Sequence, residues 1–338
     1  MPDSKNCQHE VIGVLSKPES YGLAPNTAVD LHETHGAIVF LAGNRAYKLK
    51  RAVRYPYMDY STPERRRLMC EQELAVNRRT APLLYLEVRP IVRDTADRLR
   101  FGPLEGAAIL DWVVVMRRFE EDDLLESMRR RGRLEAASMR PLAEAIAAFH
   151  GSAEVRRDFG GAAGIAAVIE ENIAIIEGQA GHPFESHAIE RYARLSTARF
   201  DRVRGILEQR REDGFVRRCH GDLHLNNICL IDGMPMLFDA IEFSEAFACI
   251  DVFYDLAFLV MDLDRHGLRG HANILLNRYL EMTKDHGGLA TLPLFLSLRA
   301  AIRAHVTATA AATVQSRTDA QAKLREAAAL LDWSIAYL

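Results

Sequence analysis

Apolar and polar residues alternate in the N-terminal part of the chain in the manner of β-strands. An apolar run over 37–41 meets Gly43-Asn44, and residues 45–50 follow with strand alternation, which predicts a hairpin. Further strand-like stretches follow along the chain. The last of them contains the continuous apolar run Trp112-Val113-Val114-Val115-Met116, which is typical of a buried strand. These further stretches complete a predicted antiparallel sheet, and they cover 84–93, 98–101 and 109–116.

Helical patterns occupy most of the remaining sequence. Ser61-Thr62-Pro63-Glu64 combines a capping residue with an early proline and predicts a helix start, and Ala81-Pro82 predicts its end. Beyond Phe119 the composition becomes rich in alanine, and an apolar stripe at helical spacing ends at His150, which we interpret as a structural histidine. Longer periodic segments follow at 163–178, 184–212, 249–264, 270–284 and 292–337.

The patterns therefore predict an α+β chain in two parts. Residues 1–116 begin with a polar arm over 1–30 that includes a short helix, and the sheet and one main helix follow. Residues 117–338 form a mostly helical part. A chain of 338 residues is long enough for one large two-lobed unit with an ample core.

Composition narrows the functional classes. The net charge is −3, and the arginine runs 65–67 and 129–131 lie on predicted helices without interleaved aromatic residues, so we expect no nucleic-acid partner. Five scattered cysteines without CxxC spacing are typical of a reduced, cytoplasmic chain. The apolar stretches are short and interrupted by aspartate, which predicts no membrane segment and no signal peptide.

Residues 219–239 carry the clearest chemistry. Asp222 is followed after five residues by Asn227, a spacing that protein kinases use for a catalytic base and a magnesium ligand. The run 228–231 predicts a strand, Asp232-Gly233 a two-residue turn, and 234–238 the return strand, which delivers Asp239 beside Asn227. A hairpin with polar turn residues explains the turn equally well, but it leaves the polar groups before the apolar strand unexplained.

Phosphoryl transfer requires positioning and neutralisation of charge. In this scheme Asp222 accepts the proton of the attacking hydroxyl, and Asn227 and Asp239 hold Mg²⁺ through oxygen atoms, the ligands that a hard cation prefers. Lys48 and Lys50 share one face of the predicted hairpin with Ala46, and Ala46-Tyr47-Lys48 matches the end of the kinase V-A-I-K pattern.

Further residues are assigned by the same comparison with kinases. We expect Lys48 to contact the nucleotide phosphates and Lys50 to contribute little. On the predicted helix, Glu73 is the chosen partner of Lys48 and Glu71 the alternative. We also expect the segment from Met116 through Arg117 and Arg118 to Phe119 to contact adenine through its backbone.

These residues resemble a known family. His220-Gly221-Asp222-Leu223-His224 with Asn227, then Phe238-Asp239 and Tyr254-Asp255-Leu256-Ala257, are similar to motifs of the aminoglycoside phosphotransferases and their choline-kinase-like relatives. About residues 30–335 most resemble the phosphotransferase-like part of bacterial bifunctional proteins that also carry a P-loop ATP-binding domain. The resemblance implies a bilobal, protein-kinase-like fold that uses ATP and Mg²⁺. This chain has no Walker A motif, so such a P-loop domain would be separate or missing.

The predicted function is transfer of the ATP γ-phosphate to a hydroxyl of a small molecule. Six acidic residues after Asp239 suggest a cationic acceptor such as an amino sugar, an aminoglycoside or another amine-bearing alcohol, and they are Glu242, Glu245, Asp251, Asp255, Asp262 and Asp264. Asp251 and Asp255 also fit a structural role. The alternatives are a kinase-like pseudoenzyme or nucleotide-binding module, a protein kinase, and a metallophosphoesterase that uses Asp222-Leu223-His224 as metal ligands.

Overall fold

The computed structural model describes residues 4–55, 58–103, 105–181, 183–312, 314 and 316–338. The chain forms two compact units. The sheet unit consists of Met1–Arg133 and Asn226–Glu245, and the helical unit of Leu134–Leu225 and Ala246–Leu338. This division does not coincide with the expected boundary between residues 116 and 117.

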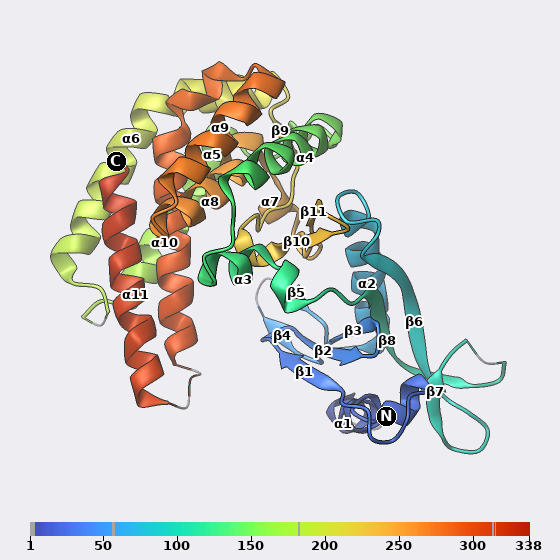
Figure 1. Ribbon diagram of the computed structural model, residues 1–338. Helices are drawn as coiled ribbons and strands as arrows, with labels where there is room; N and C mark the ends of the chain where they lie inside the picture. Colours follow the sequence, from blue (N-terminus) through green and yellow to red (C-terminus); the bar gives the residue numbers. More distant parts are fainter. Residues whose placement is uncertain (1–3, 56–57, 104, 182, 313, 315) are drawn as a thin grey trace. The chain divides into compact units, whose positions relative to one another are not determined.

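A six-stranded antiparallel sheet organises the sheet unit (Figure 1). The hairpin predicted over 37–50 is present, with Gly43 at a φ of 56° in its turn. In spatial order the strands are β1 (Asp30–Glu33), β2 (Ala37–Ala42), β3 (Arg45–Lys50), β8 (Ala108–Arg117), β6 (Tyr85–Arg93) and β7 (Leu99–Phe101).

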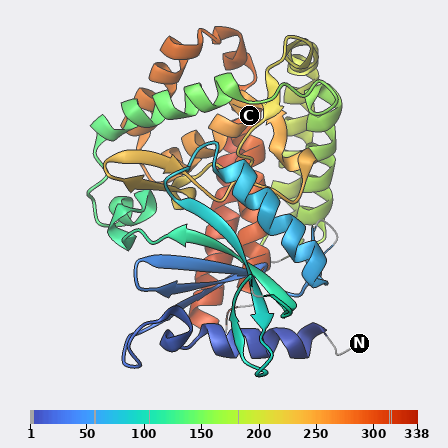
Figure 2. The ribbon, with the colours of Figure 1, turned by 90° about the vertical axis from the view of Figure 1, so that its right-hand side faces the viewer.

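Both faces of this sheet are covered. Helix α1 (Ser4–Leu15) packs on the face that carries Leu49, Val113 and Val115. Helix α2 (Pro63–Asn77) lies across the opposite face, which carries Ala46, Val114 and Met116 (Figure 2). Because successive side chains of a strand point to opposite faces, burial on both sides explains the continuous apolar run of β8.

The hairpin of β10 (Ile228–Ile231) and β11 (Met234–Leu237) joins the same core as α2. Its residues Cys229, Ile231 and Met236 pack with Ala46 and Met116. This packing explains why Asn226–Glu245 belongs to the sheet unit. Short elements complete the unit, and they are β4 (Arg54–Tyr55), β5 (Met58–Asp59) and α3 (Leu125–Arg130).

Helix α2 begins where the sequence predicted. Thr62 caps it by accepting a hydrogen bond from the backbone N–H of Arg65, and Pro63 is its first residue. The helix ends at Asn77, before the predicted stop at Ala81-Pro82, and the buried side chains Cys70, Glu73 and Val76 recur every three residues. Glu73 therefore lies on the face that packs on the sheet.

The helical unit is built around α8 (Val252–Arg265), in which every residue from 252 to 263 is buried. Asp251 caps α8, and the predicted helical segment 249–264 begins instead with β12 (Cys249–Asp251), which pairs with β9 (Val216–Arg218). The other long helices of this unit are α4 (Met139–Ser152), α5 (Gly161–Glu177), α6 (Ser186–Glu212), α9 (Arg269–Thr283), α10 (Leu292–Ala311) and α11 (Arg317–Ala336). The short helix α7 (Glu245–Ala248) contains the point in the chain at which the sheet unit ends and the helical unit resumes.

The predicted helical segment 292–337 is two helices rather than one. α10 and α11 lie side by side (Figure 1) and pack through small residues, among them Ala301, Ala304, Ala308 and Ala327. None of the described helices is long and apolar enough to span a bilayer. Among the described side chains, Cys70, Cys219, Cys229 and Cys249 are buried and form no disulfide, and the side chain of Cys7 lies outside those described.

Candidate functional site

Lys48 and Glu73 form an ion pair in the sheet unit. Nζ of Lys48, on β3, lies 2.8 Å from Oε1 of Glu73, on α2, and the Glu73 side chain is fully buried. Glu71, the alternative left open by the sequence, lies on the exposed side of α2 and pairs with Arg67. Glu73 is thus the glutamate that contacts Lys48.

The β10–β11 hairpin carries Asn227 and Asp239 at its open end. Its turn residues Asp232 and Gly233 adopt φ angles of 53° and 77°, as a tight hairpin turn requires. The backbone N–H of Phe238 donates to the carbonyl oxygen of Asn227 at 2.9 Å, so the residues that flank the hairpin are neighbours. Oδ1 of Asp239 lies 2.5 Å from Nζ of Lys48.

The electrostatics of this group favour charged side chains. Burial alone would raise the pKa of Glu73, but the ammonium groups of Lys48 and Lys50 outweigh burial and lower that pKa to about 2. Burial would lower the pKa of Lys48, whereas Asp239 and Glu73 raise it well above its ordinary value. Both partners therefore remain ionised at neutral pH.

The donor set at the hairpin fits a magnesium ion. Asp239 offers a carboxylate whose side chain is 45% exposed, and Asn227 offers an amide oxygen at the same end of the hairpin. Oxygen donors of this kind suit a hard cation that keeps several water or phosphate ligands.

Lys50 has partners that the sequence analysis did not assign. Its Nζ lies 2.6 Å from Oε2 of Glu73 and 2.5 Å from Oε1 of Glu242, and the residue is only 1% exposed. The alternation of β3 placed Lys50 on the correct face. The long-range partner Glu242, 192 residues away, had no local signal.

The segment after β8 is already engaged with the protein. The backbone N–H of Arg117 donates to Leu84 and that of Arg118 donates to Asn44, at 2.8 and 3.0 Å. Met116 is buried opposite Ala46. These two N–H groups are thus not available to an adenine base, and an adenine contact from this segment would need other backbone groups.

Asp222 belongs to the helical unit, where histidines surround it. Its Oδ2 lies 3.3 Å from Nε2 of His224. Desolvation would raise the pKa of Asp222, but His224, His220 and Arg303 together hold that pKa well below its usual range. Asp222 is therefore ionised at neutral pH, as an acceptor of a proton must be.

Two aspartates of α8 hold the loop that carries Asp222. The backbone N–H groups of His220 and Gly221 donate to the two carboxylate oxygens of Asp255, at 3.0 and 2.8 Å. Gly221 has a φ of 85°, a conformation that glycine adopts without strain. The N–H of Leu225 donates to Oδ2 of Asp262 at 3.0 Å. The loop is fixed at both of its ends.

His150 supports the same loop and has the structural role expected from the sequence. Its Nε2 lies 3.0 Å from Oδ2 of Asp255, and its Nδ1 lies 2.9 Å from the hydroxyl of Tyr279. His150, Cys219 and Asp255 are close enough together to suggest a metal site. Each already has a protein partner, because Sγ of Cys219 donates to the carbonyl of Ile250, and we therefore interpret the group as a hydrogen-bond network.

Five of the six acidic residues that suggested a cationic acceptor have partners within the protein that the structure describes. Glu242 pairs with Lys50 within the sheet unit. In the helical unit Asp255 holds the Asp222 loop, and the remaining pairs are Asp251 with Arg210, Asp262 with Arg265, and Asp264 with Arg269. Most of the charge pattern that suggested a cationic acceptor is therefore taken up by contacts within the protein.

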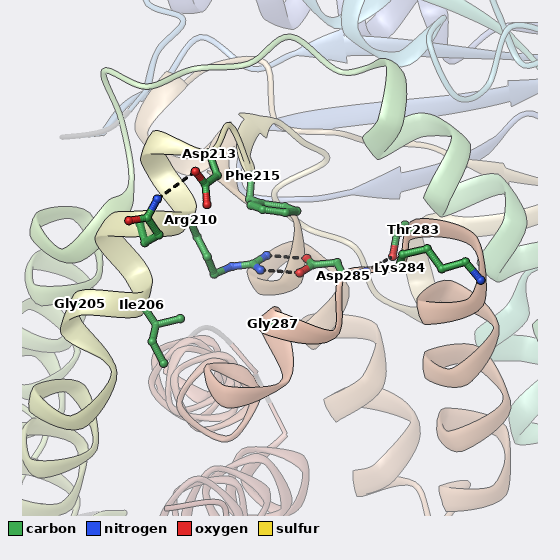
Figure 3. A pocket seen from close by; sticks show the side chains of 10 residues that line it. Gly205, Ile206, Arg210, Asp213, Phe215, Thr283, Lys284, Asp285 and Gly287 are labelled. Atoms are coloured by element: carbon green, nitrogen blue, oxygen red, sulfur yellow. Dashed lines mark hydrogen bonds and ion pairs between the residues drawn. The ribbon is translucent and has the colours of Figure 1, made fainter.

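A cavity of about 440 Å³ lies in the helical unit, between α6 and the end of α9. Figure 3 shows the side chains that line it. Arg210 on its wall makes paired hydrogen bonds to Asp251 and to Asp285, all between 2.7 and 2.9 Å. The guanidinium also lies over the rings of Phe215 and Phe253. Because its charge is fully paired, we assign Arg210 a structural role.

Comparisons of the sequence identify relatives without a defined activity. No protein-family model matches the chain. Uncharacterised proteins from Mycobacterium tuberculosis and Mycobacterium bovis are 31% identical over 281 residues, which are 82% of this chain and 54% of theirs. The chain thus spans about half the length of the curated relatives it matches.

Solved structures extend the comparison. A choline/ethanolamine kinase family protein from Mesorhizobium loti has a TM-score of 0.53, 13% identity and 98% coverage of both chains. Choline kinase from Cryptosporidium parvum has a TM-score of 0.55 at 9% identity, covering 98% of this chain and 95% of that one. An aminoglycoside phosphotransferase in a ternary complex with AMP-PNP and hygromycin B has a TM-score of 0.51 at 13% identity, covering 96% and 98%.

The predicted fold class is therefore confirmed, with an antiparallel sheet and one main helix in one unit and helices in the other. The chain has the bilobal, protein-kinase-like fold that choline kinases and aminoglycoside phosphotransferases share.

Proposed function

We propose that this protein is an ATP- and Mg²⁺-dependent phosphotransferase that moves the γ-phosphoryl group of ATP to a hydroxyl of a small molecule. The observation that carries the proposal is the contact of Lys48 with both Glu73 and Asp239 in a fold used by small-molecule kinases. Protein kinases use a lysine held by a helix glutamate and an aspartate that binds the metal, and the contacts of Lys48 with Glu73 and Asp239 support the same roles here.

Each residue has one role in the proposed reaction. Lys48 donates to the α- and β-phosphates, and Glu73 keeps its ammonium group in position. Asn227 and Asp239 are the residues that would hold Mg²⁺, and a bound ion would neutralise phosphate charge. Asp239 accepts a hydrogen bond from Lys48 in the structure, and its carboxylate is the group that would meet the ion.

Asp222 is the proposed acceptor of the proton. The hydroxyl oxygen of the acceptor forms a bond to the γ-phosphorus, the bond from that phosphorus to the β–γ bridging oxygen breaks, and ADP leaves. The hydroxyl proton passes to the Asp222 carboxylate. Its low pKa makes Asp222 a weak base, which suits a loose transition state in which the proton moves late.

The acceptor is proposed to be a small-molecule alcohol. A screen of candidate acceptors should include amine-bearing alcohols, because the solved structures of this fold include choline kinases and a complex with hygromycin B. The internal pairing of the acidic residues gives no further support to a cationic acceptor, so neutral sugars and acidic alcohols belong there too.

A panel assay tests the proposal. ATP consumption is measured with aminoglycosides, amino sugars, choline, neutral sugars and peptides, for the wild-type protein and for Asp222→Asn. We expect one class of small alcohol to stimulate ATP consumption only with Mg²⁺, and Asp222→Asn to abolish the stimulation. Exposed Glu71→Gln is the control and should behave as wild type. Stimulation by a peptide instead would favour a protein kinase, and nucleotide binding without any turnover would favour a binding module.

A further inference from the structure

Lys50 is a buried lysine beside the proposed phosphate-binding lysine. Its Nζ lies 2.6 Å from Glu73 and 2.5 Å from Glu242, and 4.9 Å from the ring centre of Tyr60. The hydroxyl of Tyr60 donates to the same Oε1 of Glu242 at 2.8 Å. At 1% exposure Lys50 does not present its ammonium group to solvent, so it is not placed to contact a nucleotide itself.

Glu73 divides its two carboxylate oxygens between two lysines. Oε1 accepts from Lys48 and Oε2 accepts from Lys50. With Oε2 occupied by Lys50, the carboxylate cannot turn to give both oxygens to Lys48. Because Lys50 already neutralises part of the negative charge of Glu73, Glu73 neutralises less of the positive charge of Lys48. More of that positive charge is therefore left to attract phosphate.

The same ammonium group joins three segments that the reaction requires. Lys50 lies at the end of β3, two residues after Lys48, and Glu73 lies on α2. Glu242 follows Asp239 by three residues in the segment after β11. A single buried cation thus ties the strand of the phosphate lysine to the helix of its glutamate and to the segment of the metal aspartate.

Stability alone gives little reason for such an arrangement. Burying two ions costs several kcal/mol, and replacement of a buried ion pair by apolar residues is often neutral or stabilising. The pair is better explained by the orientation that it imposes on Glu73 and on the Asp239 segment.

We propose that Lys50 and Glu242 are positioning residues for the Mg²⁺–nucleotide site, acting through Glu73 and through the segment that carries Asp239. The inference rests on the proposed function and deepens it, and it reverses the expectation that Lys50 contributes little. Positioning partners of metal ligands typically change metal affinity by about 10–100-fold when they are removed.

Three variants separate positioning from stability. Lys50→Met removes the cation that Glu73 and Glu242 share, and Glu242→Gln removes one of the two carboxylates around Lys50. Each variant should lower both the melting temperature and the affinity for Mg²⁺ with AMP-PNP, the affinity by roughly tenfold or more. The double variant Lys50→Met/Glu242→Leu removes both charges. It should recover most of the melting temperature while its affinity remains low. The pair Arg67–Glu71, on the exposed side of the helix α2 that carries Glu73, provides the control. Arg67→Met/Glu71→Gln should change neither the melting temperature nor the affinity.

Calorimetric titration with AMP-PNP, with and without Mg²⁺, decides the outcome. A double variant that regains wild-type affinity along with its stability would overturn the positioning role, because a purely structural pair predicts that result. A wild-type protein without Mg²⁺-dependent nucleotide binding would instead overturn the proposed function. Wild-type binding that all three variants retain would overturn this inference alone.

Discussion

Oδ1 of Asp239 lies 2.5 Å from Nζ of Lys48, so the proposed metal ligand and the proposed phosphate ligand are each other's partners. Nucleotide and Mg²⁺ would have to separate them, each residue exchanging its partner for a ligand of opposite charge. Because the exchange replaces one favourable contact by two, binding of nucleotide and binding of metal should be coupled.

The coupling gives the first prediction. Asp239→Ala should remove the part of nucleotide affinity that depends on Mg²⁺, whereas Lys48→Ala should weaken nucleotide binding with and without the ion. Isothermal titration of both variants in the presence and absence of Mg²⁺ measures this. Equal affinities for wild type and Asp239→Ala under both conditions would exclude Asp239 as a metal ligand.

Glu73 should make the free energy of unfolding depend on pH in the acidic range. Its pKa in the folded protein is about 2, below the value of 4.5 for an ordinary glutamate, because two ammonium groups outweigh its burial. A depressed pKa stabilises the folded state above pH 4.5, and that stabilisation is lost as the pH falls from 4.5 towards 2. It is on the order of 3 kcal/mol. Urea unfolding across this range should show a steeper drop for wild type than for Glu73→Gln, which keeps only the contribution of the other carboxylates, and parallel curves would contradict the assignment.

Asp255 should control the loop of Asp222. It accepts two backbone N–H groups and contacts His150, so Asp255→Asn would place an amide donor against these donors. We expect a loss of about 3 kcal/mol in the free energy of unfolding. In the folded fraction the turnover number should fall more than nucleotide affinity does. Asp158→Asn, at an exposed ion pair of the same unit, should change neither.

His224 distinguishes a kinase from a metallohydrolase. It contacts Asp222 at 3.3 Å, and its ring lies 5.2 Å from that of Phe258, positions that support the carboxylate. We expect His224→Asn to retain measurable transfer while Asp222→Asn has none, with activity supported by Mg²⁺ or Mn²⁺ and unaffected by a zinc chelator. Stoichiometric zinc in the purified protein, or a folded His224→Asn variant as inactive as Asp222→Asn, would favour the metallohydrolase.

Local patterns predicted the parts of the site that local geometry determines. Strand alternation placed Lys48 correctly, and the turn Asp232-Gly233 predicted the hairpin that brings Asp239 to Asn227. Periodicity could not choose between Glu71 and Glu73 as long as the buried face of the helix was unknown. The packing of α2 on the sheet makes that choice.

Contacts between distant residues were beyond local reasoning. Lys50 meets Glu242 across 192 positions, and Arg210 meets Asp251 across 41. The acidic residues after Asp239 therefore suggested a site for a cationic acceptor, although four of the six pair with lysine or arginine side chains of the protein. The periodic segment over 292–337 is two helices, α10 and α11. Because all α-helices have the same period of 3.6 residues, periodicity alone did not mark the break between them.

The central claim is that the γ-phosphoryl group of ATP reaches an alcohol. Mass spectrometry of the acceptor pool after incubation with ATP carrying ¹⁸O in its γ-phosphate tests it most directly. We predict labelled phosphate in an ester of one acceptor, formed only with Mg²⁺ and absent with Asp222→Asn. Label found solely in inorganic phosphate, at a rate that Asp222→Asn leaves unchanged, would contradict the account.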